Sequence, residues 1–124
     1  MKSMSVVLAA LALSVIGMSA LAQAAPPRLD AHAASSTKIT VTAVEFKFSL
    51  SKSSLSKPGT VTFDIVNKGH VQHDFKINGA TSKLIGTGKS TTLTTKFTKK
   101  GRYFYECTVA GHAALGMKGY FTVK

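Results

Sequence analysis

The most informative part of the chain is Tyr103–Gly119, which reads YFYECTVAGHAALGMKG. Its first residues have the period-2 pattern of a β-strand that ends near Cys107. Cys107, His112 and Met117 then follow at C-x4-H-x4-M spacing, with three glycines in the same segment. Glycine lets the backbone bend tightly, so we expect the thiol, the imidazole and the thioether to converge.

This combination of side chains predicts a copper site. Thiolate and thioether sulfur together with imidazole favour copper over magnesium or calcium, which prefer oxygen ligands. Two His and one Cys in a trigonal set, with a weak axial Met, are typical of copper sites that transfer electrons. Zinc is the competing metal because it also binds Cys and His, but Met117 and the lack of a second Cys argue against it.

The single cysteine also has less specific interpretations. A lone Cys is usually a small core residue, and a lone Met usually fills a gap in the core. A catalytic Cys–His pair is a further alternative, but no orienting Asn or oxyanion hole can be identified, so we predict no enzymatic activity. The one Cys cannot form an internal disulfide, and an unpaired thiol in an exported protein needs a reason such as metal binding.

The predicted copper site needs a second His from elsewhere in the chain. His73 is in phase with Phe75 and Ile77 in an alternating pattern, so its side chain should face the core. His70 has the opposite parity and follows a Lys-Gly turn, so it should face solvent. His32 lies in the leader that precedes the folded domain. We therefore predict that His73 completes the site.

The chain after Thr37 alternates with period 2 and has no convincing helical period. One run changes phase between Ala43 and Val44, which predicts a β-bulge there. Short strand-like runs are separated by turn signals, which are Pro58-Gly59, Asn67-Lys68-Gly69, Asn78-Gly79 and Lys99-Lys100-Gly101. This pattern predicts an all-β sandwich or barrel.

The N-terminus has the three-part pattern of a secretory signal peptide. A positive start at Lys2 precedes an apolar run from Val6 to Leu21, and small residues suit cleavage after Ala22 or Ala24. The run is short for a membrane anchor, so we expect no stable membrane insertion and export to the periplasm. The predicted division is a signal peptide over residues 1–24, a flexible leader over residues 25–37 and one folded domain over residues 38–124.

The net charge of +11 indicates an acidic partner surface or an anionic membrane face. The lysines are scattered along the chain and lack the interleaved aromatic residues of a nucleic-acid platform, so we expect no nucleic-acid partner. The alternative is that the lysines only solubilise the strand faces.

The residues quoted above are similar to those of the cupredoxins, especially the plastocyanin and azurin group. The matching segments are His73-Asp74-Phe75, Gly101–Cys107 and Gly111–Gly119. The resemblance covers residues 38–124 and implies a Greek-key β-sandwich with one copper ion (Cu(I)/Cu(II)) at one end. It implies that His73, Cys107 and His112 are equatorial ligands and that Met117 is the axial ligand.

Three departures from plastocyanin are visible in the sequence. The spacing from Cys107 to His112 is two residues longer, Glu106 occupies the position of an exposed docking Tyr, and this basic chain lacks an acidic patch. A photosynthetic role is therefore disfavoured. Asp74 either braces the loop of Cys107 by a hydrogen bond or is a solvated strand residue.

The resemblance implies a monomeric one-electron carrier. The ring edge of His112 would be exposed in an apolar patch where redox partner proteins dock, and Lys118 would steer an acidic partner. The alternative is a copper-binding module for copper storage, delivery or sensing, which would use the same ligands. The lack of Met-rich or His-rich tracts argues against bulk copper handling.

Overall fold

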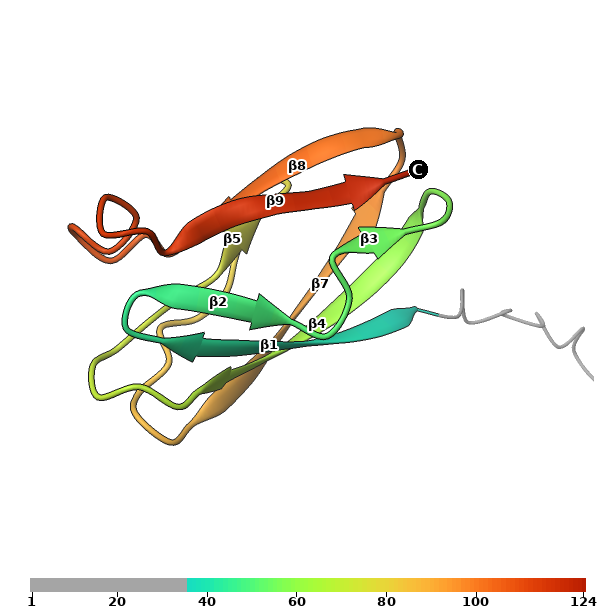
Figure 1. The fold of residues 1–124 in the computed structure, drawn as a ribbon. Helices are drawn as coiled ribbons and strands as arrows, with labels where there is room; N and C mark the ends of the chain where they lie inside the picture. Colours follow the sequence, from blue (N-terminus) through green and yellow to red (C-terminus); the bar gives the residue numbers. More distant parts are fainter. Residues whose placement is uncertain (1–35) are drawn as a thin grey trace, which may run out of the picture.

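A computed structural model describes residues 36–124 of the chain (Figure 1). Within these residues the regular secondary structure is entirely β, with nine strands in two sheets. The predicted signal peptide and the leader up to residue 35 lie outside the described residues. Over the described range, no helix is long and apolar enough to cross a membrane.

The first sheet contains four strands in the order β2-β1-β4-β7. Its two central strands run parallel, with Thr37 opposite Val61 and Ala43 opposite Asn67. The outer pairs are antiparallel. The strands are β1 (Thr37–Val44), β2 (Lys47–Leu50), β4 (Gly59–Asn67) and β7 (Ser90–Phe97).

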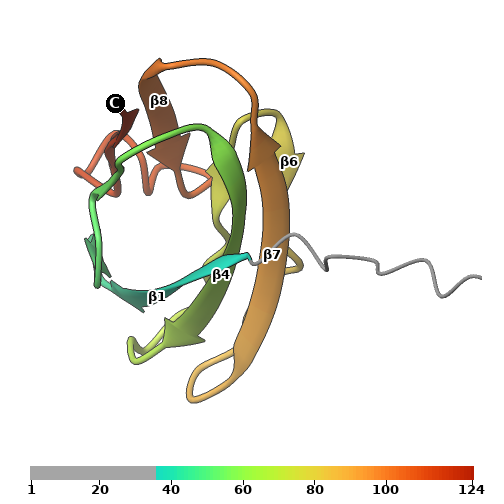
Figure 2. The same ribbon diagram turned by 90° about the vertical axis from the view of Figure 1, so that its right-hand side faces the viewer.

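The second sheet contains five strands in the order β3-β9-β8-β5-β6. They are β3 (Ser54–Leu55), β9 (Lys118–Val123), β8 (Gly101–Glu106), β5 (Lys76–Ile77) and β6 (Ala80–Thr81). The chain changes sheets between β2 and β3, which pairs parallel with β9. Seen from the end, the strands curve around a common core (Figure 2). The predicted all-β sandwich is therefore confirmed.

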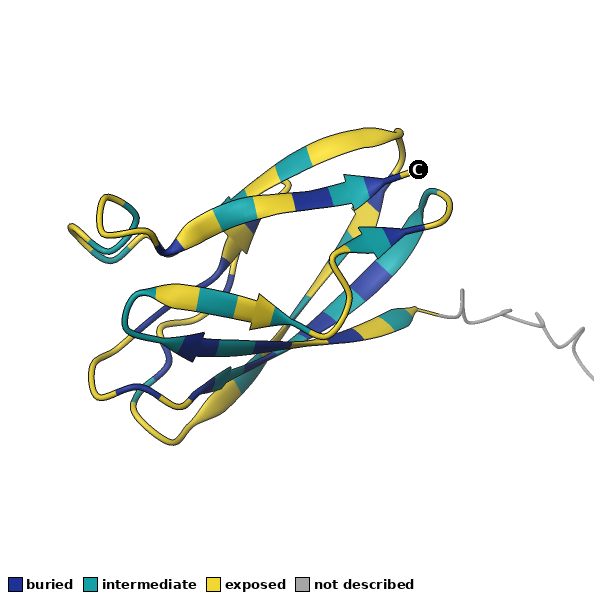
Figure 3. Ribbon diagram, viewed as in Figure 1, coloured by how far each residue is buried: buried dark blue, intermediate teal, exposed yellow. Residues whose placement is uncertain are grey.

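The core fills the space between the sheets and follows the alternation predicted from the sequence. In β4 the residues Val61, Phe63 and Ile65 are fully buried, whereas their neighbours are partly exposed (Figure 3). The ring of Phe63 lies at the centre of an aromatic cluster, with ring centroids 5.2, 6.4 and 5.7 Å from those of its three neighbours, which are Phe75, Phe97 and Phe121.

The predicted β-bulge between Ala43 and Val44 is wrong. Val44 pairs with Lys47, so the chain reverses through a tight turn at Glu45 and Phe46 and returns as β2. The change of phase therefore marks a hairpin. The sequence did not predict it because the turn lacks Asn-Gly or Asp-Gly, the strongest sequence signals for a two-residue hairpin turn. The hairpin places Glu45 and Phe46 at one end of the sandwich.

The turn predicted at Asn78-Gly79 is confirmed. Ile77 pairs with Ala80, and both turn residues have positive φ, 52° at Asn78 and 74° at Gly79. This is the conformation that a two-residue hairpin turn requires and that Asn-Gly adopts readily.

The directions of the strands bring several loops to one end of the sandwich. The parallel strands β1 and β4 both end there, β8 ends there, and β9 begins there. Figure 1 shows the β1–β2 turn, the segment after β4 and the β8–β9 loop at this end. We call it the metal end, because the residues predicted to bind copper lie in these loops.

The central position of Phe63 gives a test of the core. We expect Phe63→Ala to lower the free energy of unfolding by about 3–5 kcal/mol, because truncation leaves a cavity among packed rings. Urea denaturation of the metal-free protein measures the change. Leu84 is 55% exposed, so Leu84→Ala should change the stability by only about 0.5 kcal/mol or less. Similar losses for the two variants would contradict this description of the core.

Candidate metal centre

Backbone hydrogen bonds within the loop that follows β8 give this loop a compact shape. The N–H of Cys107 donates to the carbonyl of Met117 at 3.0 Å, and the N–H of Met117 donates to the carbonyl of His112 at 3.1 Å. The N–H of His112 donates in turn to the carbonyl of Val109 at 3.0 Å. These bonds hold Cys107, His112 and Met117 at defined positions in one compact loop.

The segment after β4 holds His73. Its backbone forms a two-way bridge with Ile85, with N···O distances of 3.2 and 2.7 Å, and its side chain is completely buried. The side-chain amide of Asn67 donates to the carbonyls of Val71 and Ile85, each at 2.8 Å, and so fixes this segment. His70 is exposed. The parity argument that chose His73 as the inward-facing residue is confirmed.

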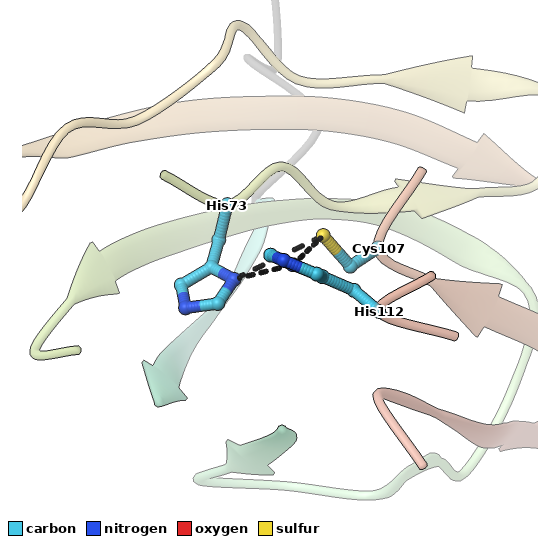
Figure 4. Close-up of side chains that lie close together, drawn as sticks. All are labelled: His73, Cys107 and His112. Carbon is cyan, nitrogen blue, oxygen red and sulfur yellow. Dashed lines mark hydrogen bonds between the residues drawn. The ribbon is translucent and has the colours of Figure 1, made fainter. Parts of the chain in front are cut away.

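The side chains of His73, Cys107 and His112 point toward one another (Figure 4). Nδ1 of His73 lies 3.2 Å from Nδ1 of His112, and Sγ of Cys107 lies 3.5 Å from Nδ1 of His112 and 4.0 Å from Nδ1 of His73. The three donor atoms come from two segments far apart in the sequence and lie within 4.8 Å of one another.

These separations fit one shared ion. Metal–nitrogen bonds of about 2.1 Å and a metal–sulfur bond of about 2.3 Å, at angles near 120°, separate two nitrogens by about 3.6 Å and nitrogen from sulfur by about 3.8 Å. The distance between the two nitrogens is shorter than the first value. Of the two distances from sulfur to nitrogen, one is shorter and one longer than the second value. Two imidazole nitrogens and one thiol sulfur form a donor set that suits copper.

Met117 lies beside this group. Its side chain is completely buried and belongs to a small apolar cluster with Cys107 and Ala43, against which Phe46 and Phe48 pack. The structure therefore brings all four residues predicted to bind copper to the metal end.

The environment of Cys107 favours the neutral thiol over the thiolate. The residue is 1% exposed, and burial raises the pKa of the thiol above its usual value. A buried thiolate is costly without a compensating charge, and a metal ion bound by Cys107 would supply that charge and displace the proton.

Asp74 braces the two segments against each other. Its carboxylate accepts a hydrogen bond from the backbone N–H of Thr108 at 2.6 Å and a second from the Thr108 hydroxyl. Asp74 is only 7% exposed. Of the two interpretations left open by the sequence, the brace is therefore confirmed. It ties the residue after His73 to the residue after Cys107.

Two residues at the site were missed by the sequence analysis. Glu45 contacts Nε2 of His73 at 3.2 Å, and the ring of Phe46 lies 5.1 Å from that of His112 in an edge contact. Both lie in the turn that was interpreted as a bulge. The available signal was a carboxylate in a strongly basic chain, placed where the strand pattern changes phase.

A β-sandwich with a Cys, His and Met loop at one end defines the class of protein. The chain belongs to the cupredoxin family, since the family model for the cupredoxin-like domain matches residues 8–123. The resemblance noted from the sequence is thus confirmed. A comparison with curated protein sequences gives no significant match.

Solved structures of auracyanins share the fold. The dithionite-reduced auracyanin of Roseiflexus castenholzii is 24% identical, with a TM-score of 0.63 over 72% of this chain and 98% of that one. Auracyanin B is 25% identical, with a TM-score of 0.60 over 71% and 88%. Auracyanin A of Chloroflexus aurantiacus, described as a "blue" copper protein, is 22% identical, with a TM-score of 0.59 over 71% and 98%.

The brace formed by Asp74 can be tested without metal. We expect Asp74→Ala to lower the free energy of unfolding by about 1–3 kcal/mol, because it leaves the backbone N–H of Thr108 without its acceptor. Asp74→Asn keeps one carbonyl oxygen for that N–H and should lose less. Urea denaturation of the metal-free protein measures both variants, and unchanged stability of Asp74→Ala would contradict the brace.

Proposed function

We propose that this protein is an exported blue-copper protein that carries one electron at a time between redox partners. The observation that carries the proposal is the convergence of three donor atoms, from His73, Cys107 and His112, beside the buried Met117. In this proposal the first three residues are equatorial ligands and Met117 is the weak axial ligand. The protein acts as a carrier and not as an enzyme.

Bound copper supplies a one-electron couple between Cu(I) and Cu(II), and the chain supplies a rigid site for it. Electron transfer is fastest when the ligands move little between the two oxidation states. His73 is fixed by its bridge to Ile85, and Cys107 by its backbone bond to Met117. Both side chains are buried, so water has little access to them. These features support a carrier.

The surface around His112 supports docking of a redox partner. His112 is partly exposed, whereas His73 and Cys107 are buried, so a partner approaches the centre most closely there. Leu115 in the same loop is 63% exposed and Val71 in the neighbouring loop is 43% exposed. We propose that these apolar side chains contact the partner and that the exposed Lys118 favours an acidic one.

We also propose that residues 1–24 direct export to the periplasm and that a leader follows them up to the domain, which begins with β1 at Thr37, the last residue of the predicted leader. The support is the charged start, the apolar run and the small residues at the expected cleavage position.

The visible spectrum tests the metal and its ligands together. The copper-loaded protein should have the intense absorption band of a Cu(II)–thiolate, and Cys107→Ser should abolish it because serine offers no thiolate. His70→Ala is the matched control, since His70 is exposed in the segment that leads to His73. The control should keep the band. A colourless copper complex of the unchanged protein would exclude the proposed site.

The axial role of Met117 predicts a change in potential without a loss of colour. A thioether donor stabilises Cu(II), so Met117→Leu should raise the reduction potential and retain the intense band. Spectroelectrochemistry of the two proteins measures both quantities, and an equal potential would remove Met117 from the axial position.

Rapid electron exchange with an acidic cytochrome would support a carrier. Slow exchange with ready release of Cu(I) would favour copper delivery instead.

A further inference from the structure

Glu45 lies at the metal end but outside the predicted ligand set. It occupies the turn between β1 and β2, and its carboxylate reaches across to the segment after β4. One oxygen, Oε1, accepts two hydrogen bonds, from the backbone N–H of His70 at 2.6 Å and the backbone N–H of Val71 at 3.0 Å, and lies 3.2 Å from Nε2 of His73.

The surroundings of the Glu45 carboxylate fix its position. Burial acts to raise its pKa, but the hydrogen bonds from the backbone and from His73 outweigh burial and lower the pKa to about 2. Gly69 lies against the carboxylate, and a Cβ atom at this position would overlap Oε1 of Glu45. The glycine therefore leaves room for the carboxylate.

The oxygen of Glu45 that faces His73 already accepts two backbone N–H groups and so acts as an acceptor, and its contact with His73 therefore requires a proton on Nε2. In a neutral imidazole the other nitrogen then has no proton. That nitrogen, Nδ1, is the one that faces the sulfur of Cys107 and Nδ1 of His112. Glu45 therefore selects the tautomer of His73 in which the atom facing the other donors is free to bind a metal.

We propose that Glu45 is a positioning residue that fixes the tautomer of His73 and lowers the reduction potential of the bound copper. The proposal rests on the proposed function. A carboxylate that accepts the second N–H of a metal-bound His raises the basicity of that ligand. The more basic ligand and the negative charge behind it both stabilise Cu(II) relative to Cu(I).

The charge of Glu45 acts in a favourable environment. The Glu45 side chain is 24% exposed, and the His73 imidazole that it contacts is fully buried. Water and salt therefore screen this charge less than they screen a charge on the outer face of a sheet. In a chain of net charge +11, a carboxylate at this place offsets locally the positive potential of the surface.

The tautomer is tested on the metal-free full chain by the ¹⁵N chemical shifts of the His73 ring. In the neutral ring of the unchanged protein, we expect the proton to lie on Nε2. Glu45→Gln keeps an oxygen acceptor and should keep this tautomer, whereas Glu45→Ala should give a mixture. A proton on Nδ1 in the unchanged protein, or an unaltered ring in Glu45→Ala, would overturn the proposal.

The charge is tested by the reduction potential of the copper-loaded protein. Glu45→Gln should keep the intense visible band and raise the potential. Asp64→Asn is the matched control, because it also removes one negative charge from a partly exposed carboxylate, but one that lies on β4 and pairs with Lys38 at 3.9 Å instead of with His73. A shift in Glu45→Gln no larger than that in Asp64→Asn would overturn the electrostatic role.

The two measurements separate the two proposals. If the unchanged protein has no intense band with copper, the proposed function fails, and the tautomer in the metal-free chain still decides whether Glu45 positions His73. If the band is present and Glu45→Ala leaves the His73 ring unaltered, the positioning role fails while the copper site stands.

Discussion

The parallel pairing of β1 with β4 is the constraint on which the metal end depends. Because Ala43 lies opposite Asn67, both strands finish at the same level, and the residues that follow them meet. The turn after β1 carries Glu45, and the segment after β4 carries His73. An antiparallel pairing would send these residues to opposite ends of the sandwich. The antiparallel pair β8 and β9 then brings the loop with Cys107 and His112 to the same place.

Hydrogen bonds hold this end together in a chain with a single cysteine and hence no internal disulfide. Three buried polar side chains each form a hydrogen bond to a segment distant in the sequence. These bonds join Asn67 to Ile85, His73 to Glu45 and Asp74 to Thr108. In the part of the chain that the structure describes, no buried side-chain nitrogen or oxygen lacks a partner. A fully satisfied polar network is rigid, because any displacement leaves a buried group unpaired. The site therefore keeps its geometry through long-range contacts.

The sequence predicted those parts of the fold and site that depend on local pattern. Alternation identified the strands, and the loop from Cys107 to Met117 was visible because its candidate ligands lie close together in the chain. His73 was found through parity, since burial on one face of a strand follows from its phase with Phe75. Glu45 could not be found in this way. Its role depends on the pairing of β1 with β4, which no local pattern specifies, and the hairpin that carries it was interpreted as a bulge.

The contacts around the two imidazoles differ, and this difference separates tuning from docking in the proposed carrier. His73 is fully buried, and Glu45 holds its Nε2, so its basicity is set from inside the protein. His112 is partly exposed and has the ring of Phe46 at its edge, so its surroundings are apolar side chains at the surface. The two regions meet at Val71, whose backbone N–H donates to Glu45 and whose exposed side chain belongs to the proposed docking face. A substitution that keeps an oxygen acceptor at position 45, such as Glu45→Gln, can therefore change the potential while the docking face stays in place.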